Sequence, residues 1–375
     1  RLPLAMRALS CILLIQGITG EYGLAGLVGA SQTLVSAFAS PRIGQLADRH
    51  GARPVLAIAL VIQTIGVVAL IATAYANAPA LVLILSAAII GGSSVPFGSF
   101  SQSRWPLHVA RGRDLERAYA LESVFGEISF IAGPALAVFL SVEIAPPLGL
   151  IVSLAMTILA TAGMIRLPAI ETRGTDTVDA PATSLLRHPV IVVVAGSGVG
   201  MGIMFGATEI QLVAFAEELG REGLASVMIG LFAAGSLIAA ILYGLVPLRS
   251  SLRWRVLASA AWVALWMIPT ALVGSIGAMI ACMVFAGIGI APWAIAGNSL
   301  VERGVPSRAL IEAFGWVSAS VSTGAAVGAM VGGPAIDRWG ADGGQAVAII
   351  GGALAIAVAA VGLPRLARLE TRNPA

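Results

Sequence analysis

The chain has 375 residues, of which 58% are hydrophobic and only 11% are charged, and its mean hydropathy is +0.94. Soluble domains carry about a quarter charged residues, so this composition excludes a soluble protein. The formal net charge of +3 is too small to indicate a nucleic-acid partner, and every basic residue is arginine, which excludes phosphate-loop and Schiff-base sites that require lysine.

Apolar stretches of about 20 residues, long enough to cross a membrane, follow one another along the whole chain. Within hydrocarbon the backbone must satisfy its own hydrogen bonds, and these stretches lack the alternation of barrel strands. The sequence therefore predicts an all-α polytopic membrane protein in a lipid bilayer. Its twelve helices are expected at residues 1–19, 23–44, 53–75, 78–104, 115–141, 145–167, 188–216, 223–247, 254–274, 276–301, 308–335 and 343–364.

Arginine is distributed unequally between the two sets of connections. Apart from Arg1 and Arg7 in the first helix, only Arg221 and Arg338 fall on the side opposite the arginine-rich connections. Arginine-rich connections face the cytoplasm, so both termini are expected there. The longest connection, residues 168–187, is predicted to be a cytoplasmic linker. It joins an N-terminal six-helix bundle (1–167) to a C-terminal six-helix bundle (188–375).

The two halves resemble each other at a nearly constant offset in residue number. The offset is 200 at Gly44 and Gly244 and shortens to 196 at Pro96 and Pro292, where Phe97 pairs with Trp293. Two parallel six-helix repeats predict a pseudo-two-fold axis along the membrane normal. They also predict a solute site between the halves, near the midplane of the bilayer.

The repeat also bears on the first helix. It aligns Arg1 with Met201, which falls in the middle of the seventh predicted helix, and the chain does not begin with methionine. We therefore expect that the sequence starts inside its first transmembrane helix, with roughly a dozen upstream residues missing. The alternative is a complete but short first helix, because about 20 residues can just span a bilayer.

The connection between the second and third predicted helices has a distinctive sequence, Gly44-Gln45-Leu46-Ala47-Asp48-Arg49-His50-Gly51-Ala52-Arg53. It resembles the signature loop of the major facilitator superfamily, with Ala52 where a basic residue is common. The resemblance extends over all twelve spans. The chain as a whole also looks similar to uncharacterised facilitator proteins from actinobacteria. It implies two six-helix bundles in the bacterial cytoplasmic (inner) membrane, with a monomer as the default state.

In that family the loop is thought to act as a conformational latch between the half-domains, here formed by Gly44, Asp48, Arg49, Gly51 and Arg53. Asp48 is suited to this role because a carboxylate accepts hydrogen bonds from a helix N-terminus and pairs with arginine. The alternative is that Asp48 and Arg49 only anchor a loop at the membrane surface. The second copy of the motif has Leu248 where the first has Asp48, so we expect the latch to be asymmetric.

The fifth predicted helix resembles part of the antiporter motif of proton-driven exporters through Gly126, Gly133 and Pro134. The paired glycines that should follow are absent. The resemblance therefore supports export without proving it.

Carboxylates inside spans are costly and point to function. Glu127 falls about 18 Å into the fifth helix, near the midplane, and is a candidate for proton coupling; a structural pairing with arginine is the alternative. Glu122 is rotated by about 140° from Glu127 and is expected to pair with Arg104. Glu209 follows a glycine-rich run that bends easily, so a coupling role and a structural role are both open.

Family geometry places helices 1, 4, 7 and 10 around the solute cavity. By that analogy the candidate contacts with solute are Ser94, Phe97, Trp293 and Asn298. Arg1 would lie near the midplane if the first helix is truncated, where it would counter Glu127 or an anionic substrate.

These features favour a secondary transporter that exports a small organic solute in exchange for protons by alternating access. The alternatives are uptake of a small nutrient, a sugar or an organic anion, and a non-transporting membrane sensor or partner protein. No cofactor or metal is expected, since Cys11 and Cys282 lie apart in apolar stretches and the histidines are not clustered. No nucleophile–base constellation indicates an enzyme.

Overall fold

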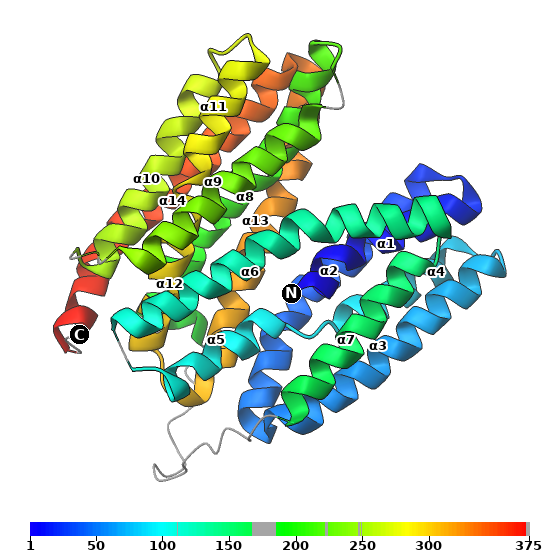
Figure 1. The fold of residues 1–375 in the computed structure, drawn as a ribbon, viewed down its shortest axis with the longest axis horizontal. Coiled ribbons are helices and arrows are strands. Elements are labelled where there is room, and N and C mark those ends of the chain that lie inside the picture. The colour runs from blue at the N-terminus through cyan, green and yellow to red at the C-terminus, as the bar shows by residue number, and fades with distance from the viewer. Residues whose placement is uncertain (111, 167–184, 222–223, 247, 249, 373–375) are drawn as a thin grey trace. The chain divides into compact units, whose positions relative to one another are not determined.

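The computed structural model describes residues 1–110, 112–166, 185–221, 224–246, 248 and 250–372 (Figure 1). Helices account for the regular structure of these residues, and no strand occurs among them. The chain divides into two compact units. Unit 1 contains Arg1–Ser101 and Ile128–Thr177, and unit 2 contains Gln102–Glu127 and Val178–Ala375. Most of the predicted linker, residues 168–184, lies outside the described ranges.

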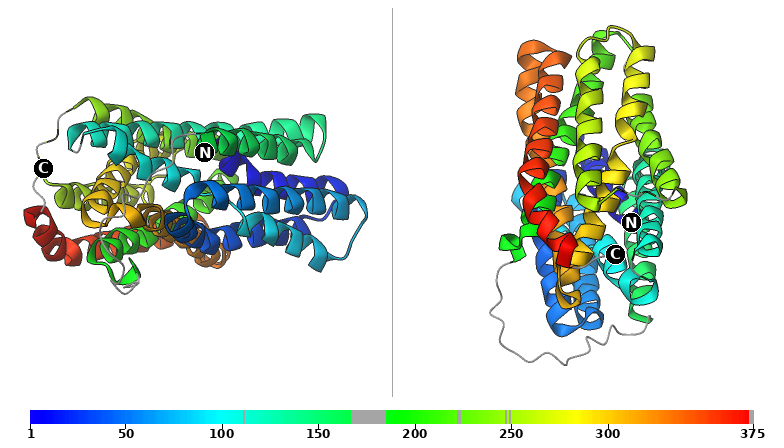
Figure 2. Two further views of the ribbon diagram at one scale, coloured as in Figure 1. Left: turned by 90° about the horizontal axis from the view of Figure 1, so that it is seen from below. Right: turned by 90° about the vertical axis from the view of Figure 1, so that its left-hand side faces the viewer.

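Unit 1 is a bundle of long helices that lie side by side (Figure 2). Its apolar core is formed where the first helix meets its neighbours, around Leu14, Val28, Leu70, Leu83 and Leu150. The helices are α1 (Leu2–Thr19), α2 (Tyr22–His50), α3 (Ala52–Tyr75), α4 (Ala80–Gly92), the first residues of α5 (Phe97–His108), the second half of α6 (Arg113–Val138), the π-helical η1 (Phe139–Ile144) and α7 (Leu148–Arg166).

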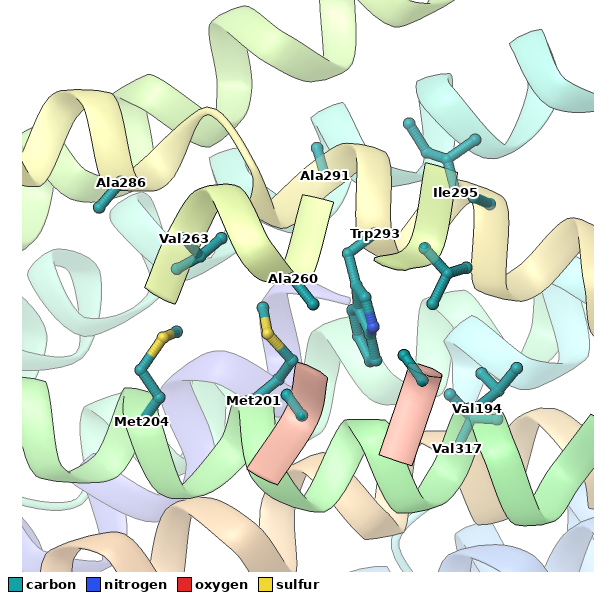
Figure 3. Packing of buried hydrophobic residues seen from close by; sticks show 14 of the residues in the cluster. Val194, Met201, Met204, Ala260, Val263, Ala286, Ala291, Trp293, Ile295 and Val317 are labelled. Carbon is teal, nitrogen blue, oxygen red and sulfur yellow. The ribbon is translucent and has the colours of Figure 1, made fainter. Parts of the chain in front are cut away.

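Unit 2 packs α8 against both α13 and α14 (Figure 1). Its apolar core is larger than that of unit 1 and includes Met201, Met204 and Trp293 (Figure 3). Most of α5 and the first half of α6 also belong to this unit. The remaining elements are η2 (Leu185–Arg187), α8 (Pro189–Glu218), α9 (Leu224–Leu245), α10 (Leu252–Thr270), α11 (Ile276–Gly287), α12 (Ile290–Gly304), η3 (Ser307–Ala309), α13 (Leu310–Trp339) and α14 (Ala341–Arg372).

Ten helical stretches among the described residues are long and apolar enough to cross a membrane. The helices α2 and α10 are not among them, because polar residues interrupt α2 and two arginines lie near the start of α10. Both are still long, with 29 and 19 residues. Every predicted helix therefore has a helical counterpart, and the predicted all-α membrane fold is confirmed.

Two helices that were expected to be continuous are each divided into two in the structure. The helix expected at 78–104 is interrupted between α4 and α5, at residues 93–96, and the helix expected at 276–301 is interrupted at residues 288–289. Pro96 has no backbone N–H and disfavours a helical conformation in the residue before it, which accounts for the first break. Average hydropathy cannot detect either break, since the flanking residues are apolar.

The second predicted helix is longer than expected. It was predicted to end at Gly44 but continues through His50, so most of the signature motif is helical. Gly51 ends it with a φ of 87°, a conformation that side chains with a Cβ rarely adopt. Arg49 and His50 lie in the last turn, where positive charge complements the helix dipole.

Candidate functional site

The two helix breaks lie at neighbouring positions of the internal repeat, although the one in unit 2 is a two-residue turn, Ile288 and Gly289, whose backbone stays in the αR region. Each break lies beside the same kind of contact. In unit 1, a Cβ on Gly91 would collide with the backbone carbonyl of Gln32; in unit 2, a Cβ on Gly287 would collide with that of Phe232. Gln32 and Phe232 are themselves separated by the repeat offset of 200. Each glycine lets two helices touch next to a break, so the repeat is present in the packing of each unit.

Broken helices at corresponding places have a functional meaning in membrane proteins. Irregular backbone at membrane depth is tolerated only where protein buries it or where it lines a cavity. Transporters with internal repeats use such breaks to form their solute and ion sites. The segments around the breaks before Phe97 and before Ile290 are therefore the candidate positions for a solute site.

The break in unit 1 brings together three of the predicted cavity residues. Ser94 lies within the break and is buried, and Phe97 begins α5 with 6% of its surface exposed. The guanidinium of Arg1 lies against the next residue, since the Cβ position of Gly98 is 3.2 Å from Arg1 Nη2. Arg1, Ser94 and Phe97 thus gather around one end of α5.

Arg7 is a buried charge beside this break that the sequence analysis does not single out as a candidate. It lies in α1, is 1% exposed, and its Nη1 donates a hydrogen bond to Ser94 Oγ at 2.6 Å. The available signal was a charged residue inside an apolar span, which is the same signal that singled out Glu127.

The break in unit 2 leads into α12, which carries Trp293 and Asn298. Figure 3 shows the Trp293 side chain pointing from α12 toward α8, between Val194 and Met201. Its Nε1 donates a hydrogen bond to Ser197 Oγ at 3.1 Å. Trp293 and Asn298 are both buried, so in this structure the indole is enclosed by the core of unit 2.

Glu127 and Glu122 contact different helices. The Glu127 carboxylate is half-buried, and its Oε1 accepts a hydrogen bond from Ser236 Oγ of α9 at 2.6 Å. Glu122 is buried and accepts a hydrogen bond from Trp105 Nε1 of α5 at 3.0 Å. The different partners agree with the predicted rotation of about 140° between the two side chains. Glu209 is exposed on α8.

The predicted latch residues lie at the junction of α2 and α3. Gly44 is buried within α2, and Asp48 is half-buried one turn further along. Arg49, Gly51 and Arg53 are exposed. The motif is thus a helix end followed by a one-residue turn, and its role as a latch stays a prediction.

A polar cluster at the start of α10 was not predicted. Arg255 Nη1 lies 2.6 Å from Glu116 Oε2 of α6 and 2.9 Å from the hydroxyl of Tyr243. Arg255 Nη2 donates to the carbonyl of Leu248 at 2.6 Å. Leu248 is the residue that replaces Asp48 in the second copy of the motif. The carboxylate that pairs with Arg255 comes from α6, a contact that alignment of the repeat cannot reveal.

The first turns of α6 also bind the end of α9. Arg113 Nη2 and Arg117 Nε each donate at 3.3 Å, to the carbonyls of Leu245 and Gly244 respectively. The last carbonyls of a helix have no partner within it, and cationic side chains satisfy them and complement the helix dipole. These bonds and the Arg255–Glu116 pair fix the start of α6 on α9 and α10.

Glycines hold α8 close to its neighbours. A Cβ on Gly202 or Gly206 would collide with carbonyls of α13, and a Cβ on Gly324 or Gly328 would collide with carbonyls of α8. The glycine stripe of α13 is thus a helix-packing face, as its small-residue spacing indicates. In the glycine-rich run of α8, Gly202 and Gly206 face α13 whereas Gly196 and Gly200 face α14. The run therefore packs against both helices, which is a different role from the bending suggested by its composition.

Metal-ligating side chains do not gather in the described part of the chain: no three His, Cys, Asp or Glu residues there are placed to hold an ion. Cys11 and Cys282 are both free and buried. Both cysteines therefore contribute to packing.

Comparison with known proteins identifies the family. The model of the Major Facilitator Superfamily matches residues 4–213. No curated protein shows significant sequence similarity to the chain. Among solved structures, the fold is similar to a bacterial homologue of the iron transporter ferroportin in its outward-facing state. The TM-score is 0.70 at 15% identity, over 98% of this chain and 100% of that one.

The fold is also similar to the human organic anion transporter MFSD10 (TETRAN), with a TM-score of 0.69 at 14% identity over 98% of this chain and 97% of that one. Identities this low show the shared fold alone. The family match covers more than half of the chain and agrees with the signature motif, the paired helix breaks and the all-helical fold. The chain therefore belongs to the major facilitator superfamily of membrane transporters, and it is a transporter rather than an enzyme.

Proposed function

We propose that this protein is a proton-coupled secondary transporter that exports a small organic solute by alternating access. The observation that carries the proposal is the hydrogen bond between Glu127 and Ser236, which joins α6 to α9 inside the helical bundle. An ionised carboxylate can only accept hydrogen bonds, whereas a protonated one also donates. A proton on Glu127 would therefore change the contact between two membrane-spanning helices, which is the physical requirement for coupling.

The proposed solute contacts are the predicted residues at the helix break of each unit. Arg1, Ser94 and Phe97 lie at the break in unit 1, and Trp293 and Asn298 follow the matching break in unit 2. This arrangement is supported by the repeat and by the tendency of transporters to place binding groups at discontinuous helices. Glu122 and Glu209 are further coupling candidates. The hydrogen bond from Trp105 favours a structural role for Glu122.

The remaining predictions complete the proposal. Gly44, Asp48, Arg49, Gly51 and Arg53 would act as the latch between conformations. The bundles would correspond to residues 1–167 and 188–375, with both termini in the cytoplasm of a bacterial cell and the chain acting as a monomer. The same mechanism would import solute if the gradients were reversed.

The proposal is tested by separating exchange from accumulation in proteoliposomes. Exchange of labelled for unlabelled solute requires no net proton movement, whereas accumulation driven by a pH gradient does. We expect Glu127→Gln to retain exchange for a solute selected from a small-molecule panel and to lose accumulation. Glu143→Gln, at an exposed glutamate of η1, is the matched control and should retain both.

Two results would contradict the proposal. Accumulation that survives Glu127→Gln would return Glu127 to a structural role. Solute movement in the native protein that never exceeds the equilibrium distribution would indicate facilitated diffusion.

A further inference from the structure

Arg7 is the largest of the fully buried side chains in the described part of the chain, with 1% of its surface exposed. It lies one turn beyond Pro3 in α1, facing the helix break of unit 1. Its hydrogen-bond partners are two hydroxyls, Ser94 Oγ at 2.6 Å and Thr157 Oγ1 at 3.5 Å. Among the described residues, no carboxylate forms an ion pair with it.

A buried cation without a counter-charge is costly. Buried charges in proteins are normally paired, because removal from water costs several kcal/mol per ion in practice. Two neutral hydroxyls, one of them at the limit of hydrogen-bond distance, compensate this cost only in part. Charged groups of this kind inside spans face functional pathways. Arg7 is therefore in an environment that an anion would complete.

The geometry of the guanidinium indicates where that anion would bind. Ser94 accepts its hydrogen bond from Nη1, the terminal nitrogen on the same side of the guanidinium as the Arg7 Cδ. The opposite edge consists of Nε, which has no hydrogen-bond partner, and Nη2, which makes only the long contact with Thr157. Two parallel N–H donors on one edge match the two oxygens of a carboxylate.

Further buried hydroxyls lie on α1, which carries Arg7, and on α7, which carries its partner Thr157. On α7, Ser153, Thr157 and Thr161 recur at intervals of four residues and are all buried. Ser10, one turn beyond Arg7 on α1, is also buried. The hydroxyls of Ser10 and Thr161 have no hydrogen-bond partner. The hydroxyls of Ser153 and Thr157 already donate to the carbonyls of Pro3 and Ser153. Ser10 and Thr161 therefore supply the uncommitted hydroxyls on these two helices, and the neighbouring core of unit 1 is apolar.

From this arrangement we propose that Arg7 binds the anionic group of the transported solute, and that the solute is an organic carboxylate with an apolar body. The inference rests on the proposed transport function and defines its substrate class. Because Arg7 is enclosed in this structure, the anion would reach it only in another conformation of the transport cycle. Ser94 would orient the guanidinium from the helix break.

The test is an equilibrium binding measurement on the full chain in lipid nanodiscs, with benzoate as the probe and benzamide as its uncharged counterpart. Benzoate should raise the unfolding temperature of the native protein, and benzamide should leave it unchanged. Arg7→Met should abolish the benzoate shift. Arg7→Lys keeps the charge but loses the two-donor edge, so it should weaken benzoate binding on the order of tenfold.

The stability of ligand-free Arg7→Met gives a second readout. If the cation is retained for binding rather than for folding, this variant should unfold at the same temperature as the native protein or higher. The matched control is Arg338→Met, the same substitution at an exposed arginine of α13, which should keep the full benzoate shift.

Three results would overturn the inference. The first is an equal effect of benzoate and benzamide on the unfolding temperature of the native protein. The second is a benzoate-induced rise in unfolding temperature that survives Arg7→Met. The third is a rise that is as large in Arg7→Lys as in the native protein. The binding assay involves neither transport nor protons. A failure of proton coupling would therefore leave benzoate binding intact, and a failure of benzoate binding would leave the coupling test unaffected.

Discussion

Two arginines buried in helices differ in how completely their charge is compensated. Arg255 has a carboxylate, a phenol and two backbone carbonyls around it, whereas Arg7 has two hydroxyls. The first arrangement is expected to support the fold, and the second is expected to await a ligand. Opposite effects on stability should follow from replacing the two side chains.

Replacing Arg255 with methionine should strongly destabilise the protein. The change would leave the Glu116 carboxylate, whose side chain is 16% exposed, with only Arg303 at 4.0 Å. Breaking a buried ion pair from one side costs about 3 kcal/mol or more in the free energy of unfolding. Thermal unfolding in detergent, combined with Glu116→Gln in a double-mutant cycle, measures the effect.

A neighbouring exposed pair provides the control for this prediction. Asp114 and Arg117 form an ion pair at 3.3 Å with side chains 57% and 49% exposed. Pairs this exposed contribute about 1 kcal/mol at most, so Asp114→Asn should change stability little. Equal effects of Arg255→Met and Asp114→Asn would show that the buried cluster is not a stabilising feature.

At the residue scale, the sequence predicts which charges are unusual but not what they contact. Glu127 is identifiable as a carboxylate within a span, and Arg7 carries the same signal as a cation within a span. Ser236 is one serine among many, and only the packing of α9 on α6 gives it a role. The carboxylate that Glu116 supplies to Arg255 is likewise a tertiary contact between residues 139 positions apart.

At the scale of single elements, the contact between α8 and α13 depends on the absence of side chains. A Cβ on Gly202 would collide with the carbonyl of Val321, and the backbone there cannot move aside without displacing α13. We expect Gly202→Val to lower the free energy of unfolding by about 3 kcal/mol or to prevent folding. Thermal unfolding, or yield of folded protein, measures this.

Gly230 in α9 is the matched control, because no atom lies within 4 Å of its Cβ position. Alanine favours a helix over glycine by up to about 1 kcal/mol, so Gly230→Ala should be neutral or stabilising. A Gly202→Val variant as stable as the native protein would refute the close contact of α8 with α13.

The turn between α2 and α3 gives a further prediction for an element. Gly51 has a φ of 87° and is the only residue between the two helices. An alanine there would be strained, so Gly51→Ala should cost about 1 kcal/mol in stability. Gly20→Ala tests the same effect at another positive φ, 73°, outside the motif. If Gly51→Ala impairs transport far more than Gly20→Ala at similar stability, the latch hypothesis gains support; equal transport would contradict it.

The helix breaks show that average hydropathy does not detect interruptions within an apolar span. Both interrupted segments are apolar on either side, so a window average extends through them. Pro96 and Pro292 were visible in the sequence and paired by the repeat, but a proline alone does not distinguish a kink from a break. The extension of α2 to His50 was missed because polar residues at a membrane surface were assumed to form a loop.

At the scale of the whole molecule, composition, span length and the repeat predict the fold class, and the resemblance of the Gly44–Arg53 motif implies the family; both are confirmed. These properties depend on averages over many residues, which tolerate local errors. The direction of transport and the solute depend instead on a few side chains and on gradients outside the protein. In the proposals made above, these side chains are Arg7 for the solute and Glu127 for the proton.

The central claim, that solute movement is coupled to protons, is tested most directly by proton flux. Proteoliposomes containing a pH-sensitive dye and the native protein are given pulses of a transported solute, without an imposed gradient. The account predicts a proton movement opposite to that of the solute, which disappears in Glu127→Gln while solute binding survives. Solute movement without any proton flux, unchanged in that variant, would contradict the account.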